Sequence, residues 1–481
     1  MKTVDSNKKL KKNIFYNGAY QLLILIVPII TTPYVTRIFT PTQMGIFSAS
    51  TAFVALFVIL SMIGLPYFGS REISNNRDNY DETFFQLWIT QGIFTVLVFA
   101  IYVFLIFIVP IGNKDIYLLQ SLLILVSIFD VSWFFIGIEE IEKTIIRNLS
   151  SKVFATLLIF LLVNKPTDLY LYVIINILAM LLGNLTMIFE LKNWINFKKV
   201  SFKSYLKKNF KDMSLLMVPQ FINSLKTSID RNLLQVLGNS YSVGIYDQGK
   251  KIINIMTAVT SAMTTAIMPR MSYLVSIGKN NEMIRLFEKI FFVFSGFSIL
   301  FINGVFAVGE PFVAIFFGDG YQEVTVVLKI CCISLIFLPI NSFFYNGMLI
   351  PLKRDKIYTY ISFIGAASIL LLNALFDTKF LFLGASLAYV ITEIILFIIA
   401  SYSLKDVVNL KMLYVNMFSL IILIILNIIS TSKIIENIYV SGEIFKFLVF
   451  GIISVILSCI FVAIFVLMRR IFNREHKKNT K

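Results

Sequence analysis

Charged side chains interrupt two apolar runs at residues 228–251, which read SIDRNLLQVLGNSYSVGIYDQGKK. This hairpin carries Asp230, Arg231, Asp247, Lys250 and Lys251, although the chain as a whole is 58% hydrophobic. A charged side chain at the centre of a bilayer costs about 2.5 kcal/mol or more. If the hairpin lies in a membrane, its charges therefore need water or one another.

The composition indicates that the chain does lie in a membrane. Its 481 residues include 47 Phe, and the mean hydropathy of +0.82 exceeds what one globular core requires. Apolar stretches of roughly 20 residues, long enough to cross about 30 Å of hydrocarbon, recur along nearly the whole length, and we count about fourteen. They are too long for barrel strands and show no strand alternation. The sequence therefore predicts an all-α integral membrane protein.

The net charge of +16 would indicate a nucleic-acid partner in a soluble protein. Here the basic residues are distributed as the positive-inside rule predicts for a membrane protein, so we expect no nucleic-acid partner. Basic residues gather before the first span, in a central loop and at the end of the chain, so both termini and this loop are expected in the cytoplasm. The loop separates about six spans from about eight and is expected to divide two lobes. The clusters include Lys8, Lys9, Lys11 and Lys12, then Lys198, Lys199, Lys203, Lys207, Lys208 and Lys211, then Arg469, Arg470, Arg474, Lys477 and Lys478.

Polar residues fall on one face of each helix of the hairpin when successive residues are projected at 100°. A water-filled interior between two lobes would explain why both helices have a polar face. The alternative is that Lys226 with Asp230, and Asp247 with Lys251, neutralise each other at i, i+4 spacing. Arg231 and Lys250 then leave the hairpin net positive, which favours an anionic ligand. The faces contain Gln220, Asn223, Lys226, Thr227, Asp230 and Arg231, and then Asp247, Lys250, Lys251, Asn254, Thr257, Ser261 and Thr265.

Isolated polar residues in other apolar spans are further candidates. The first span carries Asn17 and Gln21 and ends at Arg37, which alternatively anchors the helix at the outer interface. Asp130 and Glu393 are candidates for a sodium or proton site, since carboxylates in a lumen can couple ion gradients to motion. Pairing with a neighbouring cation is the alternative for both.

Motifs of soluble enzymes are missing from the sequence. It shows no metal-ligand spacing, phosphate-binding glycine loop or nucleophile motif. Cys331, Cys332 and Cys459 all lie in apolar runs and are expected to be core residues. We therefore expect no metal or cofactor other than a coupling Na⁺ or H⁺, and we expect the chain not to be an enzyme.

Several motifs, taken together, resemble the bacterial oligosaccharide flippases of capsule and O-antigen assembly. The resemblance continues in order along nearly the whole chain, with residues 339–346, Asn373, GAS at 384–386 and Glu393 in its second half. The motifs are PYVTRIFTPTQMGIFS (33–48), GLPYFGSREI (64–73), WFFIGIEE (133–140), IDRNLLQVLGNSYSVGIYDQGKK (229–251) and MPRMS (268–272).

The resemblance implies the fold of the multidrug and oligosaccharide exporters, with two six-helix lobes, two extra C-terminal helices and a cationic central cavity. It also implies movement of undecaprenyl-pyrophosphate-linked repeat units to the outer leaflet of the bacterial cell membrane, by alternating access. A polysaccharide polymerase and glycosyltransferases are candidate partners besides the substrate and membrane lipids. The expected segments are a basic tail (1–12), an N-lobe (13–192), a basic loop (193–211), a C-lobe (212–403), two extra helices (404–470) and a basic tail (471–481).

Matching positions suggest Arg37, Asp230, Arg231 and Lys250 or Lys251 as cavity or gating residues. The candidate substrate-binding residues are Asn17, Gln21, Arg37, Asn223, Lys226, Asp230, Arg231, Asp247, Lys250 and Lys251.

Three other functions remain open. A drug or cation antiporter of the same fold would favour an acidic cavity, whereas the hairpin is basic. A repeat-unit polymerase or glycosyltransferase would need larger outer loops than the short ones expected here. A scaffold protein of a synthesis complex is compatible with every feature of the sequence.

Overall fold

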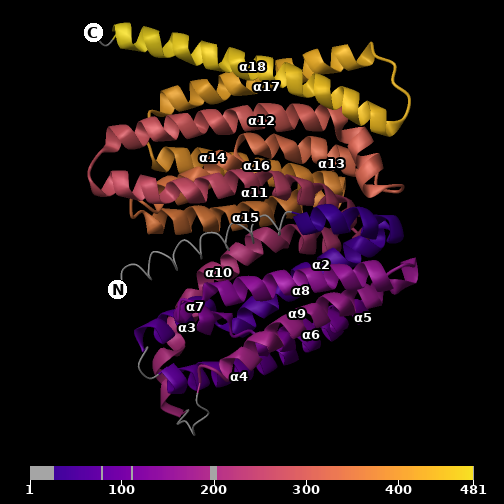
Figure 1. Cartoon of the computed structure of the whole chain (residues 1–481), viewed down its shortest axis with the longest axis vertical. Helices are drawn as coiled ribbons and strands as arrows, with labels where there is room; N and C mark the ends of the chain where they lie inside the picture. Colours follow the sequence, from indigo (N-terminus) through magenta and orange to yellow (C-terminus); the bar gives the residue numbers. More distant parts are fainter. Residues whose placement is uncertain (1–25, 77–79, 110–111, 196–202, 480–481) are drawn as a thin grey trace. The chain divides into compact units, whose positions relative to one another are not determined.

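The protein is helical throughout the part that the computed structural model describes, which is residues 26–76, 80–109, 112–195 and 203–479 (Figure 1). The predicted all-α membrane architecture is confirmed. Within these ranges, eleven helices are long and apolar enough to cross a membrane, or twelve if the bent pair Val324–Ile336 and Leu338–Leu349 is one span. The first predicted span begins outside the described ranges. Another, α10 (Lys203–Leu237), is too polar to be counted because it carries part of the charged hairpin.

Two compact units divide the chain, unit 1 (Met1–Gly244) and unit 2 (Ile245–Lys481). This division falls after α10, whereas the sequence places the lobe boundary in the loop 193–211 before it. The reason is that α10 packs against α2 (Pro41–Met62) and α3 (Leu65–Asn75). The two six-helix lobes stay a prediction of the sequence, and each unit is described by itself below.

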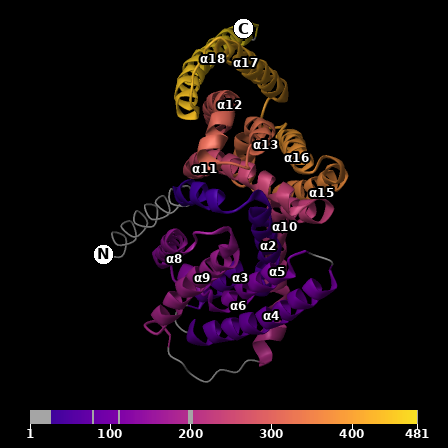
Figure 2. The same cartoon turned by 90° about the vertical axis from the view of Figure 1, so that its right-hand side faces the viewer.

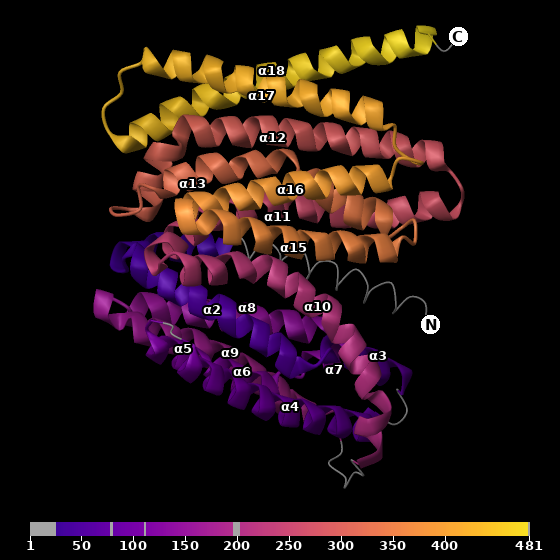
Figure 3. The ribbon, with the colours of Figure 1, turned by 180° about the vertical axis from the view of Figure 1, so that it is seen from behind.

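Unit 1 begins, in the described part, with a helix over residues 26–38. Its fourth span is broken into short pieces, and its second span is interrupted at Ile63 and Gly64 between α2 and α3. After α2 and α3 follow α4 (Tyr80–Ile108), α5 (Lys114–Gln120), α6 (Leu122–Val126), η1 (Ser127–Phe129), α7 (Ser132–Gly137), α8 (Ile141–Leu162), η2 (Pro166–Asp168), α9 (Leu169–Leu191) and α10, which contains Pro219 and bends along its length in Figure 3.

The start of α2 is determined by local sequence and by a close backbone crossing. Thr40 caps the helix, with its hydroxyl accepting the Gln43 N–H at 3.3 Å, and Pro41 occupies the first turn. A Cβ on Gly45 would lie 1.7 Å from the Ser240 carbonyl oxygen, and one on Gly244 would lie 1.9 Å from the Pro41 carbonyl oxygen. Only glycine allows α2 and the first turn of α11 (Ser240–Ser276) to touch this closely.

An aromatic cluster forms the core of unit 1 where α3, α4 and α7 meet. Phe84 stacks on Trp133 with ring centroids 5.4 Å apart, and Phe134 contacts Phe84 edge to face. The Trp133 indole N–H donates to Gln91 Oε1 at 3.0 Å, so the buried tryptophan has a partner. This cluster holds α7 next to the break in the fourth span.

Unit 2 contains the remaining helices. The element η4 is a π-helix that forms the last part of the bent pair. After α11 follow α12 (Asn280–Phe317), α13 (Val324–Cys331), η3 (Cys332–Ile336), α14 (Leu338–Ser342), η4 (Phe343–Leu349), α15 (Asp355–Phe380), α16 (Phe382–Ser403), α17 (Leu410–Glu436) and α18 (Glu443–Asn479).

The last two helices of unit 2 pack on α12 (Figure 2). Buried amides and hydroxyls join them, because a polar group in hydrocarbon gains most from another polar group. Asn303 Nδ2 donates to Ser454 Oγ and Ser458 Oγ, both at 3.1 Å, and Asn427 Nδ2 donates to Ser458 Oγ at 3.0 Å. Elsewhere in unit 2, α15 and α16 form an antiparallel hairpin (Figure 3).

Candidate functional site

The charged residues of α10 lie at different depths. Asp230 is fully buried, and its Oδ1 accepts the backbone N–H of Arg231 at 2.8 Å. Arg231 is half-buried and donates from Nη2 to the Thr227 carbonyl at 3.1 Å. Lys226 is half-buried and Asn223 is exposed. The stripe predicted from the projection therefore runs from an exposed to a buried position along one helix.

A buried lysine on α11 is held between aromatic rings. The Lys250 ammonium lies 5.4 Å from the ring centroid of Tyr246 and 4.7 Å from that of Tyr389 on α16. These contacts partly replace the water that the charge loses, because the face of an aromatic ring is negative. Asp247 and Lys251 are half-buried, and Lys251 Nζ donates to Gln248 Oε1 at 3.1 Å.

The predicted site residues thus divide between the two units, since α10 belongs to unit 1 and Lys250 to unit 2. A shared water-filled sector stays a prediction. Arg37 is exposed at the end of the helix over residues 26–38, and its Nη1 donates to the Pro33 carbonyl at 2.6 Å. Asn17 and Gln21 lie outside the described residues.

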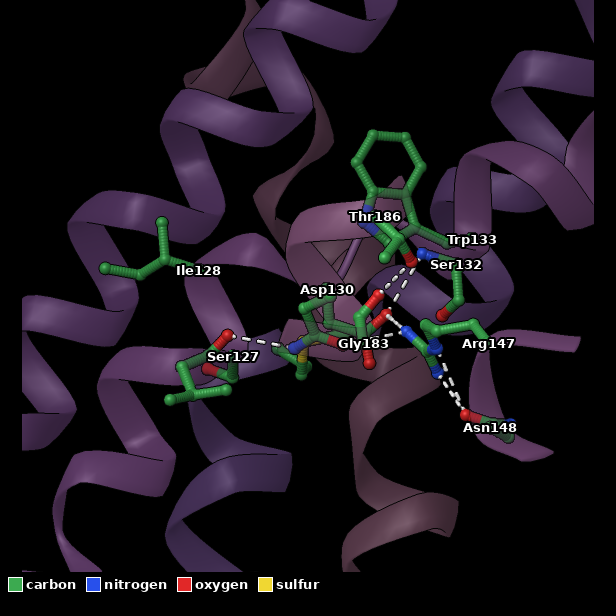
Figure 4. Close-up of polar contacts among 12 residues, drawn as sticks. Ser127, Ile128, Asp130, Ser132, Trp133, Arg147, Asn148, Gly183 and Thr186 are labelled. Atoms are coloured by element: carbon green, nitrogen blue, oxygen red, sulfur yellow. Dashed lines mark hydrogen bonds and ion pairs between the residues drawn. The ribbon is translucent and has the colours of Figure 1, made fainter. Parts of the chain in front are cut away.

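Asp130 occupies the break of the fourth span, between η1 and α7. Its Oδ1 accepts the Ser132 N–H at 3.0 Å and an N–H of Arg147 Nη1 on α8 at 2.9 Å (Figure 4). Gln91 Nε2 donates to its carbonyl oxygen at 3.1 Å. The alternative raised from the sequence, that Asp130 pairs with a neighbouring cation, describes this geometry.

Arg147 joins three elements around Asp130. Its Nη1 also donates to Asn184 Oδ1 on α9 at 2.9 Å. Its Nε and Nη2 donate to Asn148 Oδ1, as Figure 4 shows. Asn184 Nδ2 in turn donates to the Val126 carbonyl at 3.1 Å. The sequence reasoning missed Arg147, although a charged residue within the apolar run of α8 is a signal for it.

Glu393 contacts a side-chain amide in unit 2. It is buried on α16, and its Oε2 accepts the Asn341 amide of α14 at 2.9 Å. Asn341 precedes the π-helix in the bent pair, so the carboxylate lies beside irregular backbone. Asn373 and Asp377 are fully buried one turn apart on α15, which packs on α16. Asp377 is a further residue that the sequence reasoning missed.

No group of three or more His, Cys, Asp or Glu residues with metal-site geometry occurs among the described residues. Coupling to Na⁺ or H⁺ at Asp130 or Glu393 stays a prediction of the sequence.

Comparison with known protein families shows to which family the chain belongs. Residues 10–275 match the model of the family described as polysaccharide biosynthesis protein, which is more than half of the chain. The chain belongs to the polysaccharide biosynthesis protein family. The resemblance inferred from the sequence motifs is thereby confirmed at the level of the family.

Two curated relatives are distant in sequence, and the chain covers nearly their whole length. The chain is 23% identical to a protein of Escherichia coli K12 named "Putative O-antigen transporter", over 85% of this chain and 100% of that protein. It is 23% identical to the capsular polysaccharide biosynthesis protein CapF of Staphylococcus aureus, over 82% of this chain and 99% of CapF.

Two solved structures show the fold of this family member. The inward closed conformation of the lipid II flippase MurJ superposes with a TM-score of 0.73 at 14% identity, covering 94% of this chain and 98% of MurJ. An inward-facing multidrug resistance transporter of the MATE family superposes with a TM-score of 0.59 at 11% identity, covering 81% of this chain and 95% of the transporter. The chain therefore has a multi-pass transporter fold.

Proposed function

We propose that this protein moves undecaprenyl-pyrophosphate-linked oligosaccharide repeat units from the cytoplasmic to the outer leaflet of the bacterial cell membrane. The product would serve capsular, exo- or O-antigen polysaccharide assembly. The observation that carries the proposal is the row of ionic groups on α10 and α11 in a membrane protein of a polysaccharide biosynthesis family. The names of its relatives and the flippase fold agree with it.

The physical task requires a polar path across the membrane. Each sugar hydroxyl left without a hydrogen bond in hydrocarbon costs about 2–7 kcal/mol, so a repeat unit does not cross unaided. A hydrated cavity removes most of this cost. The membrane potential also helps, since moving an anionic head group outward gains about 2.3 kcal/mol per charge for each 100 mV.

In this proposal Arg231 and Lys250 hold the pyrophosphate while the cavity opens to one side and then the other. Lys250 is buried and Arg231 is half-buried, and a charge-assisted hydrogen bond to phosphate is strong in such positions. Asp230 orders the backbone next to Arg231. Lys226, Lys251, Asp247, Asn223 and Arg37 belong to the same proposed path.

Coupling to an ion gradient forms a second part of the proposal, in which Glu393 takes the proton or sodium ion. Asp130 is the weaker candidate because Arg147 already balances its charge. Glu393→Gln should abolish the dependence of polymer export on the coupling gradient. Export is compared with sodium replaced by choline and with the proton gradient collapsed, and an unchanged dependence on both would exclude Glu393 from coupling.

Deletion of the gene, followed by analysis of lipid-linked intermediates, tests the transport step. Complete repeat units should accumulate on the cytoplasmic leaflet. Incomplete units would instead identify an enzyme of repeat-unit synthesis. Complete units that reach the outer leaflet unpolymerised would point to a polymerase.

Complementation of the deletion tests the assigned residues. Arg231→Ala and Lys250→Ala should each lower surface polysaccharide while protein abundance stays at the wild-type level. Lys279→Ala is the matched control, because Lys279 is exposed and contacts Glu282 one turn away. Normal polymer in both variants would remove Arg231 and Lys250 from the proposed path.

The shared fold with a multidrug transporter gives one rival function, a drug or cation antiporter. The two functions differ in the charge that the cavity must hold. An antiporter for cationic drugs would leave the deletion strain drug-sensitive with normal surface polymer. The proposal expects the opposite phenotype.

A further inference from the structure

A pocket of about 320 Å³ opens between α8 and α9, and Arg147, the partner of Asp130, is part of its lining. Lys143, Arg147 and Ser150 follow one another along one face of α8, and Thr186 and Glu190 lie one turn apart on α9. The pocket is lined by Phe135, Lys143, Ile146, Arg147, Ser150, Thr186, Met187 and Glu190.

The helix contact beside the pocket is set by a glycine. A Cβ on Gly183 would lie 1.9 Å from Ser151 Oγ, so α8 and α9 touch at this level. Toward the end of α9 the larger side chains of Thr186 and Glu190 face α8 instead. Two packed helices therefore leave a polar opening at one end of their contact.

The cations of the pocket have donors to spare. Lys143 Nζ contacts the Glu190 carboxylate and lies 5.8 Å from the Phe135 ring centroid and 5.1 Å from that of Trp194. An ammonium has three N–H groups, so one contact to Glu190 leaves two. The hydrogen bonds of Arg147 described above engage four of its five N–H groups.

The hydroxyls of the pocket present acceptors. Ser150 Oγ donates to the Arg147 carbonyl at 2.9 Å, and Thr186 Oγ1 donates to the Gly183 carbonyl at 2.7 Å. Because each hydroxyl donates its proton to a carbonyl of its own helix, its oxygen can accept a hydrogen bond from a ligand. The pocket combines donors for an anion with acceptors for a hydroxyl group.

The surroundings of the pocket are those of a lipid headgroup site. The exposed residues on either side are large and apolar, with Ile146 49% and Phe189 62% exposed, as expected for contact with acyl chains. α9 ends at Leu191 and continues into the basic loop, so the positive-inside rule places this end at the cytoplasmic leaflet. Basic pockets between helices on this side bind acidic lipid headgroups.

We propose that this pocket binds the phosphodiester headgroup of an anionic, hydroxyl-bearing phospholipid of the cytoplasmic leaflet, of which phosphatidylglycerol is the type. Lys143 and Arg147 donate to the phosphate oxygens, and Ser150 and Thr186 accept from the headgroup hydroxyls. Glu190 holds Lys143 when no lipid is bound and competes with the phosphate. The site does not depend on whether the protein transports oligosaccharide.

The test uses the purified full-length protein in detergent, with phosphatidylglycerol binding measured by native mass spectrometry. Lys143→Gln should weaken binding about tenfold, the loss expected for one charged hydrogen bond. Lys192→Gln removes the same charge from an exposed lysine outside the pocket and should change binding less than twofold. Glu190→Gln should tighten binding, because it frees Lys143 and removes a like charge.

The outcomes separate the proposal from its rivals. Equal loss in the Lys143 and Lys192 variants would mean general attraction of acidic lipid and overturn the site. Weaker binding in Glu190→Gln would mean that the carboxylate contacts the ligand, which overturns the anion assignment. Binding of phosphatidylcholine equal to that of phosphatidylglycerol would also overturn the anion assignment. If inorganic phosphate competed as strongly as the lipid does, the ligand of the pocket would be a soluble anion and the lipid proposal would be wrong. Should Lys143→Gln fail to fold, the Glu190 variant decides alone.

Discussion

At the scale of single residues, two carboxylates acquire different surroundings from their neighbours. Asp130 and Glu393 are both carboxylates in apolar spans, yet Asp130 meets a guanidinium and Glu393 meets an amide. The ion pair between Asp130 and Arg147 joins the break of the fourth span to α8. The coupling proposal rests on Glu393 because this carboxylate is buried beside the bent pair Val324–Ile336 and Leu338–Leu349, where the span is irregular.

Arg147→Ala should lower the free energy of unfolding by about 3 kcal/mol, because it leaves the Asp130 carboxylate without its counter-charge. The two side chains are only 10% and 17% exposed, so water replaces the lost contact poorly. Thermal or denaturant unfolding of the detergent-solubilised protein measures the change. Arg71→Ala is the control, since that side chain is 51% exposed and should cost under about 1 kcal/mol. Equal losses would contradict the structural role of Arg147.

A second residue-scale prediction concerns the loops that follow η4 and α16. Arg354 Nη1 donates to Asp406 Oδ1 at 2.9 Å and to the Ser403 carbonyl at 2.7 Å. The Arg354 guanidinium lowers the pKa of the Asp406 carboxyl below its usual value. Its contribution to stability is therefore complete above the pKa of the unfolded chain, about 3.9, and is lost as the pH falls through the lower folded pKa.

Asp406→Asn should accordingly lower the Tm slightly at pH 6, and the difference from the wild type should shrink as the pH falls below about 4. The effect is small because the Asp406 side chain is 54% exposed. Paired melting curves from pH 6 to pH 3 measure it. A Tm difference that stays constant over this range would show that the charge of Asp406 is not involved.

At the scale of elements, glycines and helix breaks place the polar residues. The break after η1 puts Asp130 where its backbone is extended and its side chain can reach α8. The bent pair in unit 2 puts Asn341 next to Glu393. The close crossing of α2 with the first turn of α11 fixes where the second helix of the charged hairpin begins.

Gly45→Ala should lower the free energy of unfolding by about 1–3 kcal/mol, because the new methyl group overlaps the Ser240 carbonyl and backbone atoms have little freedom to move. Gly92→Ala on α4 is the matched control. A Cβ there meets no atom within 4 Å, so the helix should gain up to about 1 kcal/mol. Unfolding measurements on both variants test the crossing, and a stabilised Gly45 variant would refute it.

At the scale of the whole molecule, the arrangement of loops predicts how the chain is inserted. Lys279 and Asp319 are exposed residues at opposite ends of the span Asn281–Phe317. The positive-inside rule places Lys279 in the cytoplasm and Asp319 outside, because the loop around Arg270–Lys289 is basic and residues 309–322 contain no Lys or Arg.

Cysteine labelling in intact cells with a membrane-impermeant maleimide tests this orientation. Asp319→Cys should be labelled, while Lys279→Cys should react only after the cells are opened. The wild-type protein gives the background, since Cys331 and Cys332 are buried and Cys459 lies in the span Glu443–Leu467. The reverse labelling pattern would invert the predicted topology, including the cytoplasmic termini.

The sequence alone predicted the helical membrane architecture, the family and the helices that carry charge. It could do so because a span is recognised from its own length and apolarity, and a helix face from its own periodicity. Projection of α10 identified Asp230 and Arg231 without knowledge of any other helix. The same reasoning did not extend to Arg147, Asp377 or the pocket at Lys143, because each depends on what a second helix presents.

Only the tertiary structure decided which polar groups meet. Arg147 is 17 residues from Asp130, and Asn341 is 52 residues from Glu393, so no local pattern links either pair. Helix packing decides which partner each of these side chains meets, because in hydrocarbon a buried polar group can pair only with groups on the helices that it contacts. Hydropathy is a property of each segment by itself and can therefore be read from the sequence. The pairings join residues that are far apart in the sequence, so they exist only once the helices have packed.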